Sequence, residues 1–243
     1  MQSDPPVTGV GPQSPISAVM QDYLKIIYSA GEWSTAPVTT KWLAARLEVA
    51  ASSVSAMIGK LKALDLVDHR PYGSIELTEH GQLLGKAMVR RHRLIETYLV
   101  AELGYGWDEV HEEAEILEHA ISDLMLNRID VKLGHPTRDP HGDPIPDRDG
   151  QVRMPRAVTL DTLTPGSRGT VARLSDNDSE LLRYFDEVGI ALDAVITAGA
   201  ENRFGGGTAL DVATTAGQQT QVTLADQALK SIWVVPDSET KTT

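Results

Sequence analysis

A proline-rich stretch in the second half of the chain sets the strongest limit on how it folds. Residues 134–155, GHPTRDPHGDPIPDRDGQVRMP, hold five of the thirteen prolines and show no apolar periodicity. Because proline removes a backbone donor and interrupts helices, this stretch predicts a linker or an irregular surface crossing. A helical pattern precedes it and short strand-like runs follow it. The sequence therefore predicts separate domains on its two sides rather than one continuous core.

The first part of the chain has the order helix, helix, turn, helix and hairpin. Apolar spacing predicts a helix from residue 17, and similar patterns predict helices over 39–47 and 52–64. Two short β-type runs at 66–69 and 75–78 flank a Pro/Gly turn, which predicts a hairpin. This order is typical of a winged helix-turn-helix, here over residues 17–82, whose second short helix enters the major groove of DNA. A small α+β domain without a nucleic-acid role is the alternative.

Charge is unevenly distributed along the chain, whose formal net charge is −12. Residues 39–95 hold nine Lys and Arg against five Asp and Glu, whereas residues 96–150 hold four against fourteen. The basic block coincides with the expected winged helix-turn-helix and indicates a local surface for a polyanion such as DNA. The acidic sign of the whole chain argues against indiscriminate coating of nucleic acid. A mixed solvated face is the alternative to a DNA surface.

The rest of the chain predicts a second and a third domain. Helical periodicity over 81–103 and 107–133 predicts a helical domain at 83–135, with the proline-rich linker at 136–156. Strand-like runs at 169–174, 194–198, 208–212 and 232–235, with one helix at 179–188, predict a small β-barrel over 157–236. Residues 1–16 predict a disordered arm and residues 237–243 a loose tail. The expected fold class is mainly α with β.

Composition and motifs narrow the class of function. The chain has no Cys, which removes disulfides, thiolate metal sites and Cys nucleophiles. No apolar run is long enough for a membrane span, and the first sixteen residues lack the features of a signal peptide, so a cytoplasmic protein is expected. There is no phosphate-binding glycine loop and no Gly-x-Ser-x-Gly elbow. We therefore predict no catalytic residue and do not expect an enzyme.

The most informative motif is HEEAEILEH, from His111 to His119. At about 100° per residue on a helix, His111, Glu115, Glu118 and His119 share one face about 100° wide. Clustered carboxylates repel one another and are costly to bury unpaired, so a divalent cation is their natural partner. A solvated acidic helix with two incidental histidines is the alternative.

The preceding helix repeats this pattern, because His92 and Glu96 are four residues apart and face one side. Mixed imidazole and carboxylate ligands without sulfur suit Mn²⁺, Fe²⁺ or Zn²⁺. The oxygen-rich balance of the two motifs favours Mn²⁺. The two helices together predict a metal site.

The order of these parts is similar to that of a known family. The strings DYLKIIY, LAARLEVAASSVSAMIGKLKALDLVDHRPYGSIELTEHG, MVRRHRLIETYL, WDEVHEEAEILEH and RDPHGDPIP resemble the diphtheria-toxin-repressor family of metal-dependent transcriptional regulators. The likeness runs through about residues 17–150, and the remainder resembles the SH3-like third domain of the long, three-domain members. The resemblance implies a metal-activated repressor of metal uptake genes. It implies a homodimer on double-stranded operator DNA, with no membrane and no small organic substrate as partner.

The resemblance also implies which residues bind metal. In the family, the first helix supplies one ligand of the main site and the helix that carries HEEAEILEH supplies three. A further histidine serves a second metal or a binuclear pair, and an ancillary site can take a ligand from the third domain, here Asp176 or Asp178. The implied ligands are Asp22, Glu115, Glu118 and His119 in the main site, then His92, Glu96, His111 and Asp176.

Three positions bear on which metal binds. Iron-responsive members place Met where Asp22 stands and Cys where Glu115 stands, so this chain resembles the manganese-responsive branch with its harder ligands. Lys25 departs from the short manganese regulators, which carry a ligating Glu there, because an ammonium does not ligate. We therefore expect a primary and an ancillary site, with Mn²⁺ as the ion and Fe²⁺ as the alternative. A cytosolic metal-dependent enzyme is the alternative from a different class.

DNA and dimer contacts complete the expectations. The start of the recognition helix, one Lys behind it and the wing are expected to contact DNA, partly through phosphates and indirect readout. Apolar positions around Trp107, Val110, Ala114, Leu117 and Ile121 are expected to form either the dimer face or internal core. The expected DNA contacts are Ala51, Ser52, Ser53, Ser55, Lys60, Arg70 and Tyr72.

Overall fold

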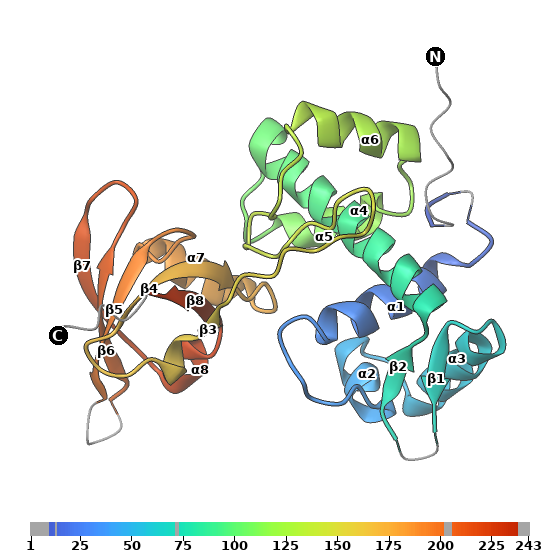
Figure 1. Cartoon of the computed structure of the whole chain (residues 1–243), viewed down its shortest axis with the longest axis horizontal. Helices are drawn as coiled ribbons and strands as arrows, with labels where there is room; N and C mark the ends of the chain where they lie inside the picture. The colour runs from blue at the N-terminus through green and yellow to red at the C-terminus, as the bar shows by residue number, and fades with distance from the viewer. Residues whose placement is uncertain (1–9, 13, 71–72, 202–205, 238–243) are drawn as a thin grey trace. The chain divides into compact units, whose positions relative to one another are not determined.

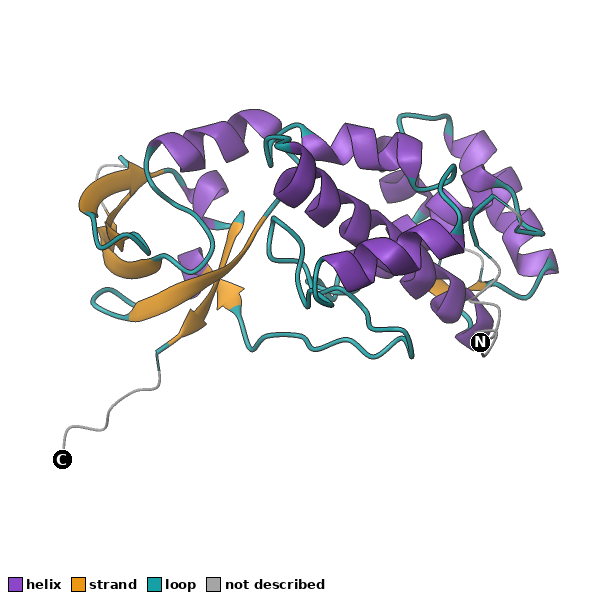
Figure 2. Cartoon of the chain, turned by 90° about the horizontal axis from the view of Figure 1, so that it is seen from above, coloured by secondary structure: helices purple, strands orange, loops and turns teal. Residues whose placement is uncertain are grey.

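The computed structural model describes residues 10–12, 14–70, 73–201 and 206–237. Its contacts divide the chain into two compact units. The first contains residues 1–98, 113–137 and 145–152, and the second contains residues 99–112, 138–144 and 153–243. The large sheet belongs to the second unit, as Figures 1 and 2 show. Among the described residues, no helix has the length and apolar character that crossing a membrane requires.

The N-terminal part of the first unit is a winged helix-turn-helix, as the sequence predicts. Figure 1 shows its three helices and its hairpin beside the N-terminal end of the long helix α4. Hydroxyl side chains cap the first two helices, because Ser17 accepts the N–H of Met20 and Thr39 accepts that of Trp42. Leu24, Leu43 and Leu61 are fully buried in one core. The elements are α1 (Ala18–Ala30), α2 (Thr40–Arg46), α3 (Ala51–Ala63), β1 (Val67–His69) and β2 (Ile75–Leu77).

Three more helices follow within the predicted helical domain: α4 (Glu79–Leu103), α5 (Val110–Leu117) and α6 (Asp123–Lys132). The helical region predicted over 107–133 is divided into two helices, α5 and α6. The chain leaves the helix after Leu117, and Ser122 starts α6 from an extended backbone by accepting the N–H of Met125. Neither Gly nor Pro marks the break, so the apolar spacing runs across it.

Two glycines bring α4 close to the winged helix-turn-helix. A Cβ atom at Gly85 would lie 2.9 Å from the carbonyl oxygen of Leu24 in α1, and one at Gly81 would lie 1.9 Å from that of Leu66. A side chain at either glycine would clash with these carbonyl oxygens, so only glycine allows this approach. The approach sets α1 against α4, the two helices that carry much of the candidate site.

Part of the predicted disordered arm is ordered. Residues 1–9 lie outside the described residues, but Val10 is buried in the core of the first unit and Ile16 packs against that core. The prediction of disorder over residues 1–16 is therefore wrong for Val10 and Ile16, which pack in the core. The physical reason is burial of apolar surface, which the Pro/Gly/Ser-rich composition of the segment conceals.

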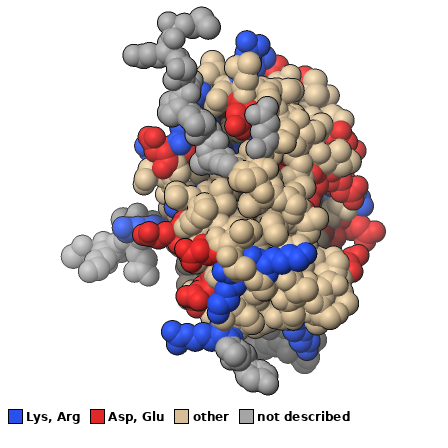
Figure 3. All heavy atoms as spheres, turned by 90° about the vertical axis from the view of Figure 1, so that its right-hand side faces the viewer, with Lys and Arg blue, Asp and Glu red and all other residues tan. Residues whose placement is uncertain are grey.

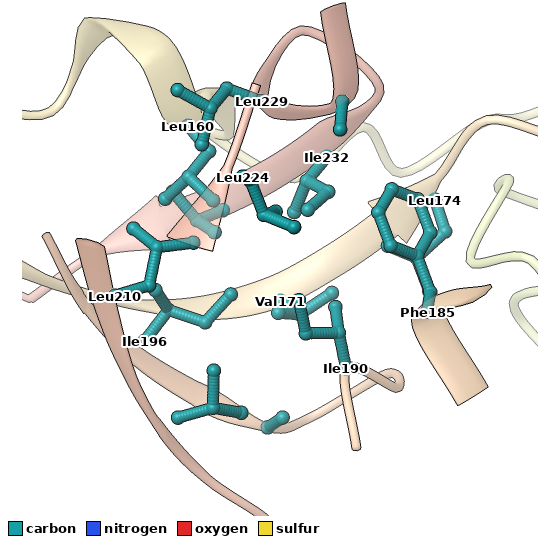
Figure 4. Packing of buried hydrophobic residues seen from close by; sticks show 14 of the residues in the cluster. Leu160, Val171, Leu174, Phe185, Ile190, Ile196, Leu210, Leu224, Leu229 and Ile232 are labelled. Atoms are coloured by element: carbon teal, nitrogen blue, oxygen red, sulfur yellow. The ribbon is translucent and has the colours of Figure 1, made fainter. Parts of the chain in front are cut away.

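The second unit holds one six-stranded antiparallel sheet in the order β3-β8-β4-β5-β6-β7. Its apolar side chains point into one interior, as Figure 4 shows for Val171, Ile196 and Leu210. This agrees with the predicted SH3-like domain. Two strands have no counterpart in the predicted runs: β3, which has two residues, and β7, which is largely exposed. The elements are β3 (Val158–Thr159), the 3₁₀ helix η1 (Leu160–Thr162), β4 (Arg168–Leu174), α7 (Ser179–Glu187), β5 (Val195–Glu201), β6 (Thr208–Ala213), β7 (Gln219–Leu224), α8 (Asp226–Leu229) and β8 (Ile232–Pro236).

The proline-rich stretch contains buried polar residues. The Asp139 side chain accepts the backbone N–H groups of His141 and Asp143, at 2.8 and 2.9 Å. Arg173 of β4 donates to the Asp143 carboxylate at 2.7 Å, and all four residues are buried. Residues 138–144 therefore pack onto the sheet of their own unit and do more than connect two domains.

The apolar positions expected at a dimer face or in a core lie mostly in the interior. Val110 and Ala114 are fully buried and Ile121 is 8% exposed. Trp107 is half-buried against the core of the second unit. Of the two alternatives, internal core is the one that the structure supports for these residues.

Candidate metal centre

Six charged or ionisable side chains gather in the first unit where α1, α4 and the end of α5 meet. Two come from α1, one from α4 and one from the last turn of α5. The last two lie in the turn after α5, although the sequence places them on the helix. Glu118 still donates its N–H to the Ala114 carbonyl at 2.9 Å, so helical bonding extends to that residue. We call these residues the carboxylate–histidine cluster: Asp22, Lys25, His92, Glu115, Glu118 and His119.

Lys25 lies between two carboxylates of the cluster. Its Nζ donates to Glu115 Oε1 and to Glu118 Oε1, both at 2.7 Å, and lies 3.4 Å from His92 Nδ1. Lys25 is 6% exposed and Glu118 is fully buried. Burial alone would lower the pKa of Lys25, but attraction by Glu118 and Glu115 outweighs it and raises that pKa. The lysine therefore stays charged and neutralises carboxylate charge in the protein without metal.

Asp22 and His119 join α1 to the end of α5. Nε2 of His119 lies 2.7 Å from Asp22 Oδ1 and 3.4 Å from Glu118 Oε1. The hydrogen bond to Asp22 raises the pKa of His119. One ligand atom of each of these three residues lies within 4.8 Å of the others. The three residues thus point donor atoms at one small volume.

His92 is held between two carboxylates. Its Nδ1 lies 2.6 Å from Glu118 Oε2, and its Nε2 lies 2.9 Å from Glu96 Oε1. Burial alone would lower the pKa of His92, but the two carboxylates outweigh it and raise that pKa to about 10. In the metal-free protein His92 is therefore a cation that donates to both neighbours.

The donor set fits a divalent cation. Burial alone would raise the pKa of Glu118, but its hydrogen bond with His92 and the nearby charges of His92 and Lys25 lower it. Similarly, Lys25 keeps the pKa of Glu115 below its usual value against the opposing effect of burial. Carboxylate oxygens and an imidazole nitrogen, without sulfur, are ligands for Mn²⁺, Fe²⁺ or Zn²⁺. The cluster can hold such an ion once the histidine protons leave.

The expected ancillary ligands are distributed over both units. Glu96 is buried in the first unit and pairs with His92. His111 and Asp176 belong to the second unit, where His111 Nδ1 lies 3.7 Å from Asp176 Oδ2. Asp178, the other candidate from the third domain, caps α7 by accepting the N–H groups of Glu180 and Leu181. Its carboxylate therefore has a structural partner.

Sequence reasoning missed one residue of the centre, Gln21. Its Oε1 lies 3.2 Å from Nδ1 of His119, and the residue is 2% exposed. No spacing or motif separates Gln21 from other polar residues on a helix, so only the packing of α1 against the turn after α5 identifies it.

The expected DNA surface is exposed on α3 and near the wing. Ala51, Ser52, Ser53 and Lys60 are exposed. Figure 3 shows most of the Lys and Arg atoms of this face in its lower half, where the winged helix-turn-helix lies in Figure 1.

The three remaining expected DNA contacts are Ser55, Arg70 and Tyr72. Ser55 is also exposed, but its hydroxyl donates to the Ala51 carbonyl at 2.9 Å, which occupies its proton within the helix. Arg70 is exposed beside the wing, and Tyr72 lies outside the described residues.

Three family models match the chain in order. They are the N-terminal DNA-binding domain of iron-dependent repressors over residues 16–75, their metal-binding and dimerisation domain over 78–147, and a FeoA domain over 158–236. The iron-dependent repressor IdeR of Mycobacterium tuberculosis is 32% identical over 200 residues, which are 76% of this chain and 84% of that protein. The chain belongs to the diphtheria toxin repressor family of metal-dependent transcriptional regulators.

Solved structures of family members agree with this assignment. A manganese-dependent transcriptional repressor in complex with manganese is 51% identical, with a TM-score of 0.84, over 89% of this chain and 99% of that chain. The repressor ScaR with bound Cd²⁺ is 32% identical, with a TM-score of 0.75, over 89% of this chain and 98% of that chain. The three-domain form expected from the sequence is confirmed.

Proposed function

We propose that this family member is a repressor activated by Mn²⁺, with Asp22, Glu115, Glu118 and His119 as the main ligands. The observation that carries the proposal is the 2.7 Å contact between Asp22 on α1 and His119 after α5. Asp22 belongs to the DNA-binding domain at 17–82, and His119 to the metal-binding domain at 83–135. Because the proposed ligands come from both domains, a bound ion favours one arrangement of the DNA-binding domain relative to the metal-binding domain.

The chain's own residues then convert metal binding into DNA binding. A divalent cation supplies positive charge to the carboxylates of the cluster. Asp22 and His119 hold α1 in place, and α1 packs in the same core as the recognition helix α3. In a homodimer this orientation sets the separation of two recognition helices, which must match half-sites about 34 Å apart or a multiple of that distance. Metal and DNA therefore strengthen each other's binding by the same factor.

The choice of Mn²⁺ over Fe²⁺ rests on the ligands and on the relatives. Asp22 and Glu115 offer hard oxygen donors, and the chain has no Cys. A 51%-identical relative of known structure is a manganese-dependent repressor. His92 and Glu96 of the first unit are proposed as ancillary ligands, and so are His111 and Asp176 of the second unit, in line with the long members of the family.

The DNA surface is proposed to be the start of α3, Lys60 and the wing. Ala51, Ser52 and Ser53 are exposed at the N-terminal turn of α3, the part of a recognition helix that meets base edges. Lys62 donates to the His69 carbonyl at 2.9 Å and so ties α3 to the wing, beside Arg70. A protein that acts on DNA in this way works in the cytoplasm of its cell.

Exposed apolar residues on α6 support the homodimer. Leu124 is 62% exposed and Val131 is 59% exposed, and their seven-residue spacing places both on one face of the helix. Leu124→Asp is expected to shift the protein from dimer to monomer in sedimentation velocity. Asp161→Asn, on the exposed surface of the third domain, is the control.

The test is fluorescence anisotropy of a labelled duplex from upstream of the protein's own gene. The protein is titrated with chelator, with Mn²⁺, and with Fe²⁺ under anaerobic conditions, against a scrambled duplex at matched salt. Sequence-selective binding is expected only with Mn²⁺. Asp22→Ala is expected to lose it, and Glu112→Ala, an exposed carboxylate on α5, is expected to keep it.

Each other outcome has a definite meaning. An equal response to Fe²⁺ keeps the regulator and rejects the metal assignment. If Asp22→Ala retains full Mn²⁺-dependent binding, the proposed ligand set is wrong. If no duplex binds in any state, selection from genomic fragments separates an operator located elsewhere from a metal-dependent enzyme.

A further inference from the structure

Gln21 has a side-chain amide whose orientation is fixed by the backbone of the N-terminal segment. Its Nε2 donates to the Ile16 carbonyl at 3.1 Å, and its Oε1 accepts the N–H of Gly11 at 3.3 Å. A flipped amide would place an N–H group against the Gly11 N–H and an oxygen against a carbonyl. The two backbone contacts therefore assign the oxygen and the nitrogen independently of any histidine.

The same oxygen faces His119. Gln21 Oε1 lies 3.2 Å from Nδ1 of His119 and can only accept a hydrogen bond. Nδ1 therefore donates a proton to Gln21 and keeps it when a cation binds. The other nitrogen, Nε2, lies 2.7 Å from Asp22 Oδ1 and 3.4 Å from Glu118 Oε1, among the carboxylates. Gln21 thus makes Nε2 the nitrogen that gives up its proton and offers its lone pair when a cation binds in the cluster.

The segment that holds Gln21 is itself fixed. Gly11 has a φ of +95°, and a Cβ atom there would lie 2.2 Å from Nη2 of Arg91, which is fully buried. The Gly11 carbonyl accepts the N–H of Ser14 at 3.0 Å, and Val10 is buried in the core. Only glycine fits this conformation and this approach.

We infer that Gln21 is a positioning residue that presents Nε2 of His119 to the bound cation, and that Gly11 and Ile16 support the metal centre through it. The inference rests on the proposed metal site. Partners that fix the tautomer of a histidine ligand contribute about 10- to 100-fold to metal affinity in other sites. Gly11 lies before the segment that matches the DNA-binding family model, which starts at residue 16. The chain therefore adds support from outside the matched region.

The first experiment measures Mn²⁺ affinity by titration calorimetry on the full chain. Gln21→Leu, which removes the acceptor, is expected to weaken binding by about tenfold or more. Gln21→Glu, which keeps an acceptor toward Nδ1, is expected to restore most of the affinity. Gln82→Leu, an exposed glutamine on α4, is the matched control and is expected to bind as the unaltered chain does.

The second experiment reads the ring directly, because a general loss of structure would also weaken binding. Long-range ¹H–¹⁵N spectra of ¹⁵N-histidine protein loaded with Zn²⁺, a diamagnetic probe, are expected to show His119 protonated at Nδ1 and metal-bound at Nε2. Gln21→Leu is expected to lose this single pattern. If Gln21→Leu does not fold, Gly11→Ala is used instead, with the same expected weakening of Mn²⁺ binding.

The outcomes separate the inference from the proposed function. If the unaltered chain binds no Mn²⁺, the metal site itself is rejected and the inference falls with it. If the unaltered chain binds Mn²⁺ but Gln21→Leu or Gly11→Ala binds it equally well, the inference alone is overturned. Metal bound at Nδ1 of His119 overturns it as well.

Discussion

Four consecutive residues of α4, Arg90 to Arg93, are buried in the first unit and meet two kinds of partner. Each arginine pairs with a different carboxylate, at 2.5 to 2.8 Å, and Asp130 also lies 3.0 Å from His135 Nδ1 and 3.6 Å from Arg148 Nε. His92 instead is a titratable side chain that lies between two carboxylates, Glu96 and Glu118. The arginine pairs are Arg90 with Asp130, Arg91 with Asp123 and Arg93 with Glu32.

The difference lies in whether the positive charge is exchangeable. An arginine keeps its charge at any pH at which the protein folds, so its pairs form a fixed part of the structure. A histidine can lose its proton, and a divalent cation can take the place of protons on His92 and His119. Buried charge that is balanced by removable protons marks the functional site, whereas charge that is balanced by arginine marks the scaffold.

The largest expected effect tests the scaffold side of this comparison. Asp130→Ala leaves Arg90 buried without its carboxylate, since the Asp130 side chain is 3% exposed and that of Arg90 is 11% exposed. We expect the free energy of unfolding of the metal-free protein to fall by about 3 kcal/mol in urea denaturation. Asp149→Ala, an exposed carboxylate nearby, is the control. Mn²⁺ affinity at a temperature where the variant is folded is expected to stay unchanged, and a parallel loss of affinity would break the comparison.

Lys25 tests the cluster, where it is the one permanent cation among the six defining residues. Lys25→Met leaves the buried Glu118 without its lysine partner, with only the titratable His92 at 2.6 Å and His119 at 3.4 Å as close partners of the cluster. We expect the metal-free protein to lose about 2 kcal/mol of stability. Saturating Mn²⁺ supplies the missing charge, so the loss in the metal-bound protein is expected to be smaller. Urea denaturation with chelator and with Mn²⁺ checks this, with Lys60→Met as control; an equal loss in both conditions would contradict it.

The sequence predicts the architecture well where local chemistry decides it. Hydroxyl caps and apolar spacing locate α1 and α2 to within about a residue, and the strands of the hairpin are found by their β-type residues and turn. It fails where tertiary contacts decide. The break between α5 and α6 has no Gly or Pro, and the short edge strand β3 is stabilised by pairing with β8.

The candidate site divides in the same way. Residue types and spacing along HEEAEILEH, with the resemblance, predict that Asp22, Glu118 and His119 come together, and the structure places their ligand atoms within 4.8 Å of one another. The contacts of Lys25 and Gln21 depend on how α1 lies against the turn after α5. No local pattern encodes that packing, so these two neighbours emerge only from the fold.

A pH titration measures the exchangeable charge. The hydrogen bond to Asp22 raises the pKa of His119, so protons compete with metal for its Nε2. Mn²⁺ affinity is therefore expected to rise with pH, by up to about tenfold per unit for each proton released. The pKa of His92 is raised from 6.5 to about 10, so its protonated form stabilises the metal-free fold fully below pH 6.5. That contribution is lost as pH rises through about 10.

Calorimetry at several pH values, in buffers of different ionisation enthalpy, counts the protons released. The Asp130→Ala variant serves as the control, because Asp130 lies outside the carboxylate–histidine cluster. This variant is expected to release the same number of protons on Mn²⁺ binding as the unaltered chain. Affinity that does not change with pH would mean that the histidine protons are not displaced by the metal.

The smallest expected effect on stability concerns an exposed ion pair, which tests whether burial or pairing geometry makes an arginine pair stabilising. Arg138 and Asp193 of the second unit form a bidentate pair at 2.8 and 2.5 Å, as ideal in geometry as the buried pairs, but their side chains are 45% and 50% exposed. Because water screens the charges of an exposed pair, Arg138→Ala is expected to lower the free energy of unfolding, measured by urea denaturation, by less than about 1 kcal/mol. The Arg138 hydrogen bond lowers the pKa of Asp193, so this contribution is present above the usual Asp pKa of 3.8 and is lost as pH falls below it. High salt is expected to reduce the effect further, whereas the cost of Asp130→Ala is expected to persist. A cost for Arg138→Ala as large as that for Asp130→Ala would mean that pairing geometry, rather than burial, makes the arginines of α4 structural.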